Sequence, residues 1–380
     1  MATTLRTPVP RVRPQKGSAR AEANVGVVGQ AEFGAVDDYL RSLGATDEQI
    51  EIARGGNNLA GLGADLVLAR GVLLSATDVA EKENLDVDRV MGLWRTLGVA
   101  PPDKDQLFFT EADAEYTAIA LSLEPFDPDG NELFRVLGSA LAGVAETAVA
   151  LYVQTVEPEM DRPGVDVVVW AQSLAHTTEM ALKFGDSMGL IFAHHMRAAI
   201  DRQRASKVSI PERYLSRLAI GFVDLVGFTP LSHRASGSEL LELISRFETR
   251  AFEAATAHGG RVVKHIGDEV MFVALDAADG CAIAEALTHA AGDDGIEPRG
   301  GVAFGDVITR YGDYFGSVVN LAARLAELAI PGEILVSQST VDTLAGGAFT
   351  FRPAGRRLLK GFDEPVEVFA LHQGEGDGDG

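Results

Sequence analysis

The sequence is poor in cysteine and in basic residues. Cys281 is the single cysteine among 380 residues, so the chain cannot form an internal disulfide and suits a reducing cytoplasm. Lysine and arginine number 33 against 55 aspartates and glutamates, which gives a formal net charge of −22. General nucleic-acid binding and attraction to an anionic membrane both depend on basic patches, so this balance argues against both. Cys281 lies in an alanine-rich helical stretch and is predicted to be a small core residue.

The sequence also lacks an uninterrupted secretory or membrane-spanning segment. Residues 1–20 carry five basic residues, three prolines and no acid, without the apolar run of a secretory signal, so we predict a disordered basic arm. Residues 133–153 are nearly apolar enough to cross a bilayer, but Arg135 and Glu146 interrupt them. Because a charge at bilayer depth costs about 2.5–3.5 kcal/mol, we expect a buried bundle helix and no transmembrane segment. The same apolarity leaves room for a lipid or fatty acid in this half of the chain.

Helical periodicity extends over the first half of the chain. Residues 74–98 have a helix-turn-helix pattern similar to that of DNA-binding proteins. The second helix begins with Asp86 and Asp88, which would present carboxylates to phosphates, so we expect a packed helical pair instead. The length of the chain and its 46% hydrophobic composition suit two domains with separate cores.

The most informative stretch is LAIGFVDLVGFT, residues 218–229. A short apolar run bounded by turn residues predicts a buried strand, and Asp224 stands at its carboxyl end, where a metal ion can reach it. Gly227 lets the backbone approach a ligand closely, and Thr229 with Pro230 suggests the start of a helix, whose amides bind phosphate readily.

A second stretch, VVKHIGDEVMFVAL at residues 262–275, predicts a hairpin with Gly267 and Asp268 in its turn. If this hairpin lies beside the first strand, Asp268 meets Asp224. Two converging carboxylates repel each other unless a divalent cation lies between them. Mg²⁺ and Mn²⁺ prefer oxygen ligands and share them with substrate phosphates, so the pair predicts metal–nucleotide chemistry.

Two further pieces follow. In residues 311–324, Ser317 is predicted to cap a helix in which Asn320 and Arg324, four residues apart, point the same way. An amide and a forked guanidinium suit a ribose and a phosphate, although alone they would be ordinary surface residues. The last piece, LKG, places Lys360 on a turn.

The pieces FVDLVGFT, KHIGDEVMF, RYGDYFGSVVNLAAR and LKG, in this order, resemble the catalytic domain of class III nucleotidyl cyclases over residues 210–371. The resemblance implies an α+β fold with a ferredoxin-like βαββαβ core. More weakly, the preceding region resembles mycobacterial adenylyl cyclases in which an all-α N-terminal domain restrains the cyclase according to pH. We therefore expect five segments: a basic arm (1–20), a helical regulatory domain (21–190), a helical linker or switch (191–209), the catalytic domain (210–372) and a disordered tail (373–380).

The resemblance implies a role for each matched position that faces metal or phosphate. Asp224 and Asp268 would bind two Mg²⁺ or Mn²⁺ ions per active site. Phe228 and Thr229 would form the phosphate-facing loop, and Lys360 would contact the terminal phosphates.

The remaining matched positions would bind the nucleoside. The resemblance makes Lys264 and Asp313 the pair that reads the purine, Asn320 the residue that orients the ribose, and Arg324 the one that stabilises the transition state. Adenine presents an acceptor at N1 and a donor at its 6-amino group, which suit a lysine and an aspartate. Guanine presents N1–H and O6 and would need an acceptor at Lys264, so we expect ATP rather than GTP.

Regulation and assembly follow from the same resemblance. In the family the metal acids come from one subunit and the nucleoside-binding set from the other, so a chain with both sets once should be a homodimer with two shared sites. His194 and His195 lie in the helical stretch that leads into the cyclase. Because histidine titrates near neutrality, they are candidate regulatory residues; the alternative is that both are plain surface residues.

Two alternatives to an adenylyl cyclase remain open. Gly267, Asp268 and Glu269 are similar to the central motif of diguanylate cyclases, but a second glycine and a following phenylalanine are missing. A degenerate cyclase domain that only binds nucleotide is the other alternative, and the competent residues at every matched position argue against it.

Overall fold

The computed structural model describes residues 30–123, 132–205, 215–228, 232, 234–289, 297–347 and 349–372. The chain divides into two compact units, Met1–Phe192 and Ala193–Gly380. The predicted basic arm, the tail, Thr229 and the last four positions of the predicted linker lie outside the described residues.

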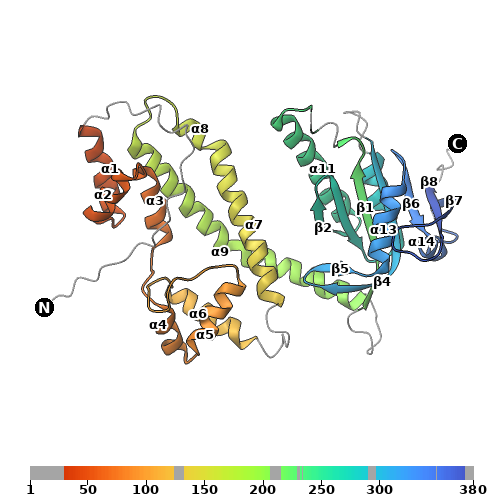
Figure 1. The fold of residues 1–380 in the computed structure, drawn as a ribbon, viewed down its shortest axis with the longest axis horizontal. Coiled ribbons are helices and arrows are strands. Elements are labelled where there is room, and N and C mark those ends of the chain that lie inside the picture. Colours follow the sequence, from red (N-terminus) through yellow and green to blue (C-terminus); the bar gives the residue numbers. More distant parts are fainter. Residues whose placement is uncertain are drawn as a thin grey trace. The chain divides into compact units, whose positions relative to one another are not determined.

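The described part of the first unit is helical, as predicted (Figure 1). Several of its helices begin at capping boxes, in which a Thr or Ser side chain and an acid or amide three residues later bond each other's backbone; Thr46 with Gln49 and Ser75 with Asp78 are two of them. The helices are α1 (Gln30–Ser42), α2 (Asp47–Gly55), α3 (Leu59–Leu68), α4 (Ala76–Glu83), α5 (Val87–Thr96), α6 (Glu111–Ser122), α7 (Glu132–Thr155), α8 (Glu157–Met160) and α9 (Val167–Ala205), the last of which continues into the second unit.

Small apolar clusters hold these helices together. One joins α1, α2 and α3 to the start of α9 through residues such as Leu40, Ile50 and Ala171. Another joins α4, α5 and α6 around Val79 and Val90. The helix-turn-helix pattern is therefore a packed helical pair, as expected, because its apolar positions are used within the unit.

The prediction that residues 133–153 form a buried helix is wrong for most of α7. Its first turns are anchored, since Phe134 packs against α5 and α6 and a side chain at Gly138 would collide with the backbone of Leu97. Beyond that contact most described side chains of α7 are exposed, although the hydroxyl of Tyr152 is buried beside Trp170 and Ser173 of α9. The exposed large apolar side chains of α7 are Leu133, Leu141, Val144, Val149, Leu151 and Val153.

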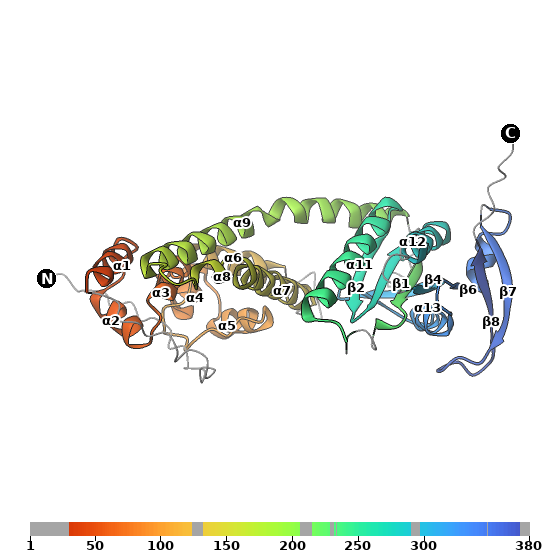
Figure 2. The same ribbon diagram turned by 90° about the horizontal axis from the view of Figure 1, so that it is seen from above.

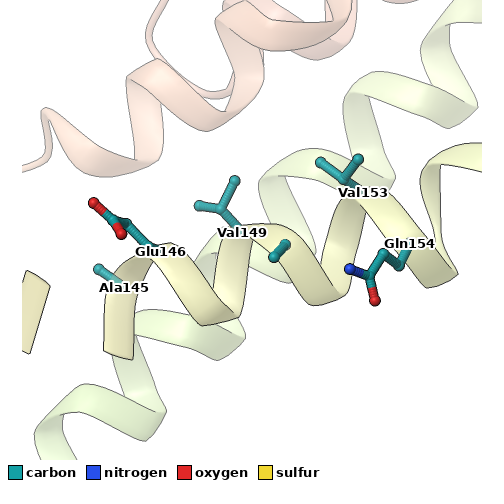
Figure 3. Close-up of a pocket in the computed structure, with 6 residues that line it drawn as sticks. Ala145, Glu146, Val149, Val153 and Gln154 are labelled. Atoms are coloured by element: carbon teal, nitrogen blue, oxygen red, sulfur yellow. The ribbon is translucent and has the colours of Figure 1, made fainter. Parts of the chain in front are cut away.

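The stretch Glu132–Met160 is, among the described residues, long and apolar enough to cross a membrane by length and composition alone, and 6% of its most apolar window is buried. A groove on α7 lies over Ala145, Glu146, Val149, Ala150, Val153 and Gln154 (Figure 3). All six residues come from one helix, so the groove is open rather than the enclosed crevice that a lipid chain would favour.

Helix α9 is also exposed over most of its length. Ala171 and Ala175 are buried near its start, whereas every described side chain from 180 to 204 is exposed or half-buried. Figure 2 shows it as a long continuous helix. Its exposed large apolar side chains in this part are Met180, Leu182, Phe184, Leu190, Ile191, Phe192, Met196 and Ile200.

The second unit is built on one mixed sheet. Its strands are β1 (Leu215–Leu225), β2 (Arg261–Ile266), β3 (Glu269–Ala274), β4 (Pro298–Arg310), β5 (Asp313–Phe315), β6 (Ile334–Ser337), β7 (Thr350–Arg357) and β8 (Val366–His372). The sheet order is β2-β3-β1-β4-β6-β8-β7, and β5 pairs with β4. The four-strand part β2-β3-β1-β4 is antiparallel throughout, which confirms the predicted ferredoxin-like βαββαβ core.

Helices cover both faces of this sheet (Figure 2). α11 (Gly237–Ala257) and α12 (Ala277–His289) pack on one face, and α13 (Ser317–Leu328) packs on the other. α14 (Gln338–Thr343) follows β6. Cys281 on α12 is fully buried, as predicted, and burial raises the pKa of its thiol to about 12, so it is an inert core residue.

Helix α13 lies unusually close to β4 because β4 has glycines beneath it. A Cβ atom at Gly301 would stand 2.2 Å from the backbone nitrogen of Ala326 and 2.4 Å from the carbonyl oxygen of Ala322. Backbone atoms cannot move aside as a flexible side chain can. Any side chain at Gly301 would therefore push α13 off the sheet.

We expect Gly301→Ala to lower the free energy of unfolding by about 1–3 kcal/mol or more, since overpacking forces the backbone to shift. Gly300→Ala is the matched control, because its Cβ would meet its nearest neighbours at an ordinary 3.4–3.5 Å. Urea denaturation of both variants measures the difference. Equal stability of the two would contradict the close packing of α13.

Candidate active site

Asp224 stands one residue before the end of β1, as predicted. The register pairs it with Glu269 on β3 and with Arg299 on β4, so three strands bring charged side chains to one end of the sheet. The Arg299 guanidinium donates two hydrogen bonds to one carboxylate oxygen of Asp224, 3.1 Å from Nε and 2.9 Å from Nη2. This bond fixes the direction in which the Asp224 side chain points.

Asp268 lies in the predicted hairpin turn between β2 and β3. The backbone of Gly267 has φ +66°, which glycine adopts without strain, and the amide of Leu225 donates a 3.4 Å hydrogen bond to the carbonyl of Asp268. The turn is thereby tied to the end of β1. Because Asp224 pairs with Glu269, the residue directly after Asp268, the two carboxyl groups converge at the end of β1 as the sequence predicts. Burial raises the pKa of the Asp268 carboxyl, and the nearby charge of Asp224 raises it further.

Two charged residues of this cluster were not predicted from the sequence. Burial, together with the charges of Asp224, Glu327 and Asp268, raises the pKa of Glu269 to about 7. Arg299 also donates to the carbonyls of Glu327, at 2.7 Å, and Ala329, at 3.3 Å, so it joins the end of α13 to Asp224. The position of Glu269 directly after Asp268 was a usable signal, whereas Arg299 could be found only through the strand register.

The acid cluster fits hard divalent cations. Asp224 and Asp268 supply carboxylate oxygens, and the raised pKa of Asp268 reflects burial first and then repulsion by Asp224, which a cation would relieve. No group of three or more His, Cys, Asp or Glu side chains within the described ranges is arranged to hold a metal alone. A site with two carboxylates leaves the other coordination positions to phosphate oxygens and water, which is how Mg²⁺ is usually held.

The structure brings Lys264 and Asp313 together. Lys264 is on β2, and Asp313 begins β5, 49 residues later; the ammonium donates to an Asp313 carboxylate oxygen. The two side chains keep 43% and 24% of their surface exposed, so a ligand can reach the pair.

A tight hairpin presents Asp313. Arg310 pairs with Asp313, which leaves Tyr311 and Gly312 as a two-residue turn with φ +56° and +70°. Two positive φ values in succession are typical of a type I′ turn, whose twist suits a hairpin. The amide of Tyr314 donates a 2.8 Å hydrogen bond to the other Asp313 oxygen, which orients the carboxylate toward Lys264.

Asn320 and Arg324 lie one turn apart on α13, as predicted. Asn320 is exposed, and Arg324 forms an ion pair with Glu327. The prediction that Ser317 caps this helix is wrong: the N-cap is Gly316, at φ +131°, and Ser317 is the first helical residue. Glycine stands there because the backbone turns through a conformation that other residues rarely adopt.

The remaining predicted residues are placed as follows. Phe228 is half-buried and packs against the core of the second unit, while Lys360 is exposed in the turn between β7 and β8. His194 and His195 are exposed on α9. Thr229 lies outside the described residues.

Comparison with known proteins finds similar chains over both units. The model of the adenylate and guanylate cyclase catalytic domain matches residues 210–373. An uncharacterised protein of Mycobacterium tuberculosis (strain H37Rv) is 32% identical over 360 residues, covering 91% of this chain and 92% of that protein.

Two relatives named as adenylate cyclases extend the likeness. An adenylate cyclase of Streptomyces griseus is 30% identical over 285 residues, 71% of this chain and 68% of that protein. The pH-sensitive adenylate cyclase of Mycobacterium tuberculosis (strain CDC 1551) is 29% identical over 365 residues, 92% of this chain and 90% of that protein. The similarity therefore extends beyond residues 210–373 into the helical first unit.

Proposed function

Because this chain belongs to the adenylate and guanylate cyclase family, we propose that it converts ATP to 3′,5′-cyclic AMP and pyrophosphate. The observation that carries this proposal is the joint presence of two chemically distinct groups on one domain. Asp224 and Asp268 converge at the end of β1, and Lys264 meets Asp313 where β2 and β5 approach. The first group suits a metal–triphosphate, and the second suits the edge of adenine.

Asp224 and Asp268 would hold two Mg²⁺ or Mn²⁺ ions. When bound, the ions lower the pKa of the ribose 3′-hydroxyl and neutralise the triphosphate. Arg299 keeps Asp224 pointed at that place through its paired hydrogen bonds. The carboxylates are half-buried, so their charges are screened less than charges on the open surface.

The reaction forms one phosphorus–oxygen bond, breaks another, and gives the proton of the 3′-hydroxyl to water. The 3′-oxygen loses its proton and bonds to the α-phosphorus, and the bond from that phosphorus to the oxygen leading to the β-phosphate breaks, which releases pyrophosphate. Asn320 would orient the ribose, and Arg324 would stabilise the negative charge that develops at the α-phosphate. Phe228 and Thr229 would line the phosphates, and Lys360 would contact the terminal ones.

We expect strong preference for ATP over GTP. Lys264 can donate to N1 of adenine and Asp313 can accept from its 6-amino group, whereas N1–H of guanine would face the lysine ammonium. Mismatched buried donors discriminate by factors up to about 10⁴–10⁵ in favourable sites, and about 10² is expected for this partly exposed pair. Offering both nucleotides at equal concentration and measuring the two cyclic products tests the prediction, which equal yields would contradict.

The working form is proposed to be a homodimer with two shared sites, in which the acids of one subunit face the nucleoside-binding residues of the other. The exposed apolar side chains of α9 support this proposal. A helix whose apolar residues meet water on every side is unstable by itself, and a second copy supplies a cover. The dimer has C2 symmetry, because each chain contributes both sets.

The first unit is proposed to restrain the cyclase in a pH-dependent way. Support comes from α9, which contains the border between the units at Phe192 and Ala193, and from the exposed His194 and His195 two residues further on. A change in their charge would alter the end of α9 that leads into β1.

We expect full-length protein to make less cyclic AMP than residues 206–380 at one end of the range from pH 5.5 to 8, with the two converging at the other end. Initial rates with ATP, measured side by side, give the comparison. Parallel pH profiles for full-length protein and residues 206–380 would contradict regulation by the first unit and leave the cyclase proposal intact. Full-length protein with both histidines replaced by glutamine is the control that separates them from other titrating groups.

We also propose, from the sequence, a cytoplasmic location and a lipid or fatty acid bound to the first unit. Arg135 and Glu146 on α7 favour a soluble chain, because charges at bilayer depth are costly. An acyl chain would contact the apolar side chains that line the open groove on α7. Mass spectrometry of an organic extract of purified protein tests for such a ligand.

A further inference from the structure

Strand β2 contains an irregularity that changes which of its side chains share a face. Arg261 pairs with Val273 and Lys264 pairs with Met271, with a register shift between Val262 and Lys264. Without the shift, residues three apart would point to opposite faces of the sheet. Because Val273 and Met271 are two residues apart, the shift places Arg261 and Lys264 on the same face.

On that face Arg261 contacts the β4–β5 hairpin directly. Its Nη2 donates to the carbonyl oxygen of Gly312, at 3.1 Å, and to the hydroxyl of Tyr314, at 3.3 Å. The guanidinium carbon also lies 5.6 Å from the centre of the Tyr314 ring. Gly312 and Tyr314 are the two neighbours of Asp313, so Arg261 holds the backbone on one side of Asp313 and the side chain of the residue on its other side.

The hairpin needs such a contact. β5 has three residues and pairs with β4, and a two-stranded ribbon of this size is marginally stable in water. Tyr314 is 7% exposed and joins the apolar cluster of Met271 and Val273, which anchors the ribbon in depth.

We infer that Arg261 is a positioning residue for base selection: it holds Asp313 opposite Lys264 through Gly312 and Tyr314. The inference rests on the proposed function, in which Lys264 and Asp313 read the purine. Arg261 itself need not touch the nucleotide. Loss of its two hydrogen bonds frees the hairpin, so Asp313 and Lys264 no longer present a fixed donor and acceptor to adenine.

The test replaces Arg261 by methionine, which keeps the aliphatic stem and removes the donors. We expect a roughly tenfold fall in the ratio of kcat/KM for ATP to that for GTP, mainly through KM for ATP. Arg217→Met is the matched control, because Arg217 also stacks on an aromatic ring, Phe304 at 5.3 Å, and that ring lies on β4 outside the turn at residues 310–314. An unchanged ratio in correctly folded Arg261→Met protein would overturn the inference.

Two further variants keep the test decisive. Tyr314→Phe removes one acceptor of Arg261 and keeps the buried ring, so it should lower the ratio of kcat/KM for ATP to that for GTP by a smaller factor than Arg261→Met. It serves as the test if Arg261→Met fails to fold. Arg261→Lys keeps one charged donor and should restore part of the selectivity; no recovery, together with an unchanged Tyr314→Phe ratio, would contradict the inference.

Binding separates this inference from the proposed function. Affinities for 3′-deoxy-ATP and 3′-deoxy-GTP, which lack the attacking hydroxyl, report base selection without turnover. An inactive wild-type protein that still prefers the adenine analogue, and loses that preference in Arg261→Met, would contradict the cyclase and support the positioning role. If wild-type protein makes cyclic AMP and Arg261→Met protein keeps the same preference for the adenine analogue, the cyclase is supported and the positioning role is contradicted.

Discussion

Arg324→Ala is expected to lower kcat for cyclic AMP formation by about 10³-fold, with a much smaller change in KM for ATP. An arginine that stabilises charge in phosphoryl transfer contributes about 10³–10⁵ to the rate, and it acts mainly in the transition state. Arg324 is on α13, one turn after Asn320, and it is about one-third exposed, so it can leave its partner Glu327 to meet a phosphate. Steady-state kinetics with purified protein measures the loss.

Glu327→Gln is the matched control for this prediction. It removes the ion-pair partner of Arg324 and leaves the guanidinium in place, so activity should change by less than about tenfold. Circular dichroism and thermal melts confirm that α13 is intact in both variants. A loss in Glu327→Gln as large as that in Arg324→Ala would show that the ion pair, rather than the free guanidinium, is what catalysis needs.

Mixing two inactive variants should restore activity. Asp224→Asn removes a metal ligand from one half of the proposed shared site, and Arg324→Ala removes the transition-state residue from the other half. In an equimolar mixture with free exchange, about half of the dimers contain one chain of each kind, and one of the two sites in each is intact. The expected activity is therefore about a quarter of the wild-type value, against almost none for either variant alone.

The activity of the mixture can be interpreted only if the two variants exchange subunits. Differently tagged copies of the two variants, co-purified through both tags, isolate the mixed dimers directly. These dimers should have about half of the wild-type activity per dimer. Inactive mixed dimers would contradict shared sites and would place all the catalytic residues of a working site on one chain.

Local sequence patterns predict those parts of the site that lie within a single strand, turn or helix. The strand before Asp224, the hairpin turn at Asp268 and the helix with Asn320 and Arg324 each have a short signature of apolar spacing and turn residues. The meeting of Lys264 with Asp313 required the resemblance to a family, since 49 residues separate them.

The features that the sequence did not predict depend on the register between strands and on what covers a helix. Arg299 reaches Asp224 only because β1 and β4 pair as they do, and Arg261 shares a face with Lys264 only because β2 has a register shift. Neither property has a local pattern. The exposure of α7 was missed for a related reason: apolar composition predicts that a helix will be covered, and it does not say by what.

Analysis of the reaction products is the most direct test for cyclic AMP formation by this protein. Purified full-length protein is incubated with ATP and Mn²⁺, and cyclic AMP and pyrophosphate are both quantified, alongside Asp224→Asn protein and a sample with chelator. The proposed reaction yields cyclic AMP and pyrophosphate in a one-to-one ratio, and both products should be lost in the variant and in the chelated sample. ATP left intact by folded wild-type protein, or its conversion to ADP and phosphate, would contradict it.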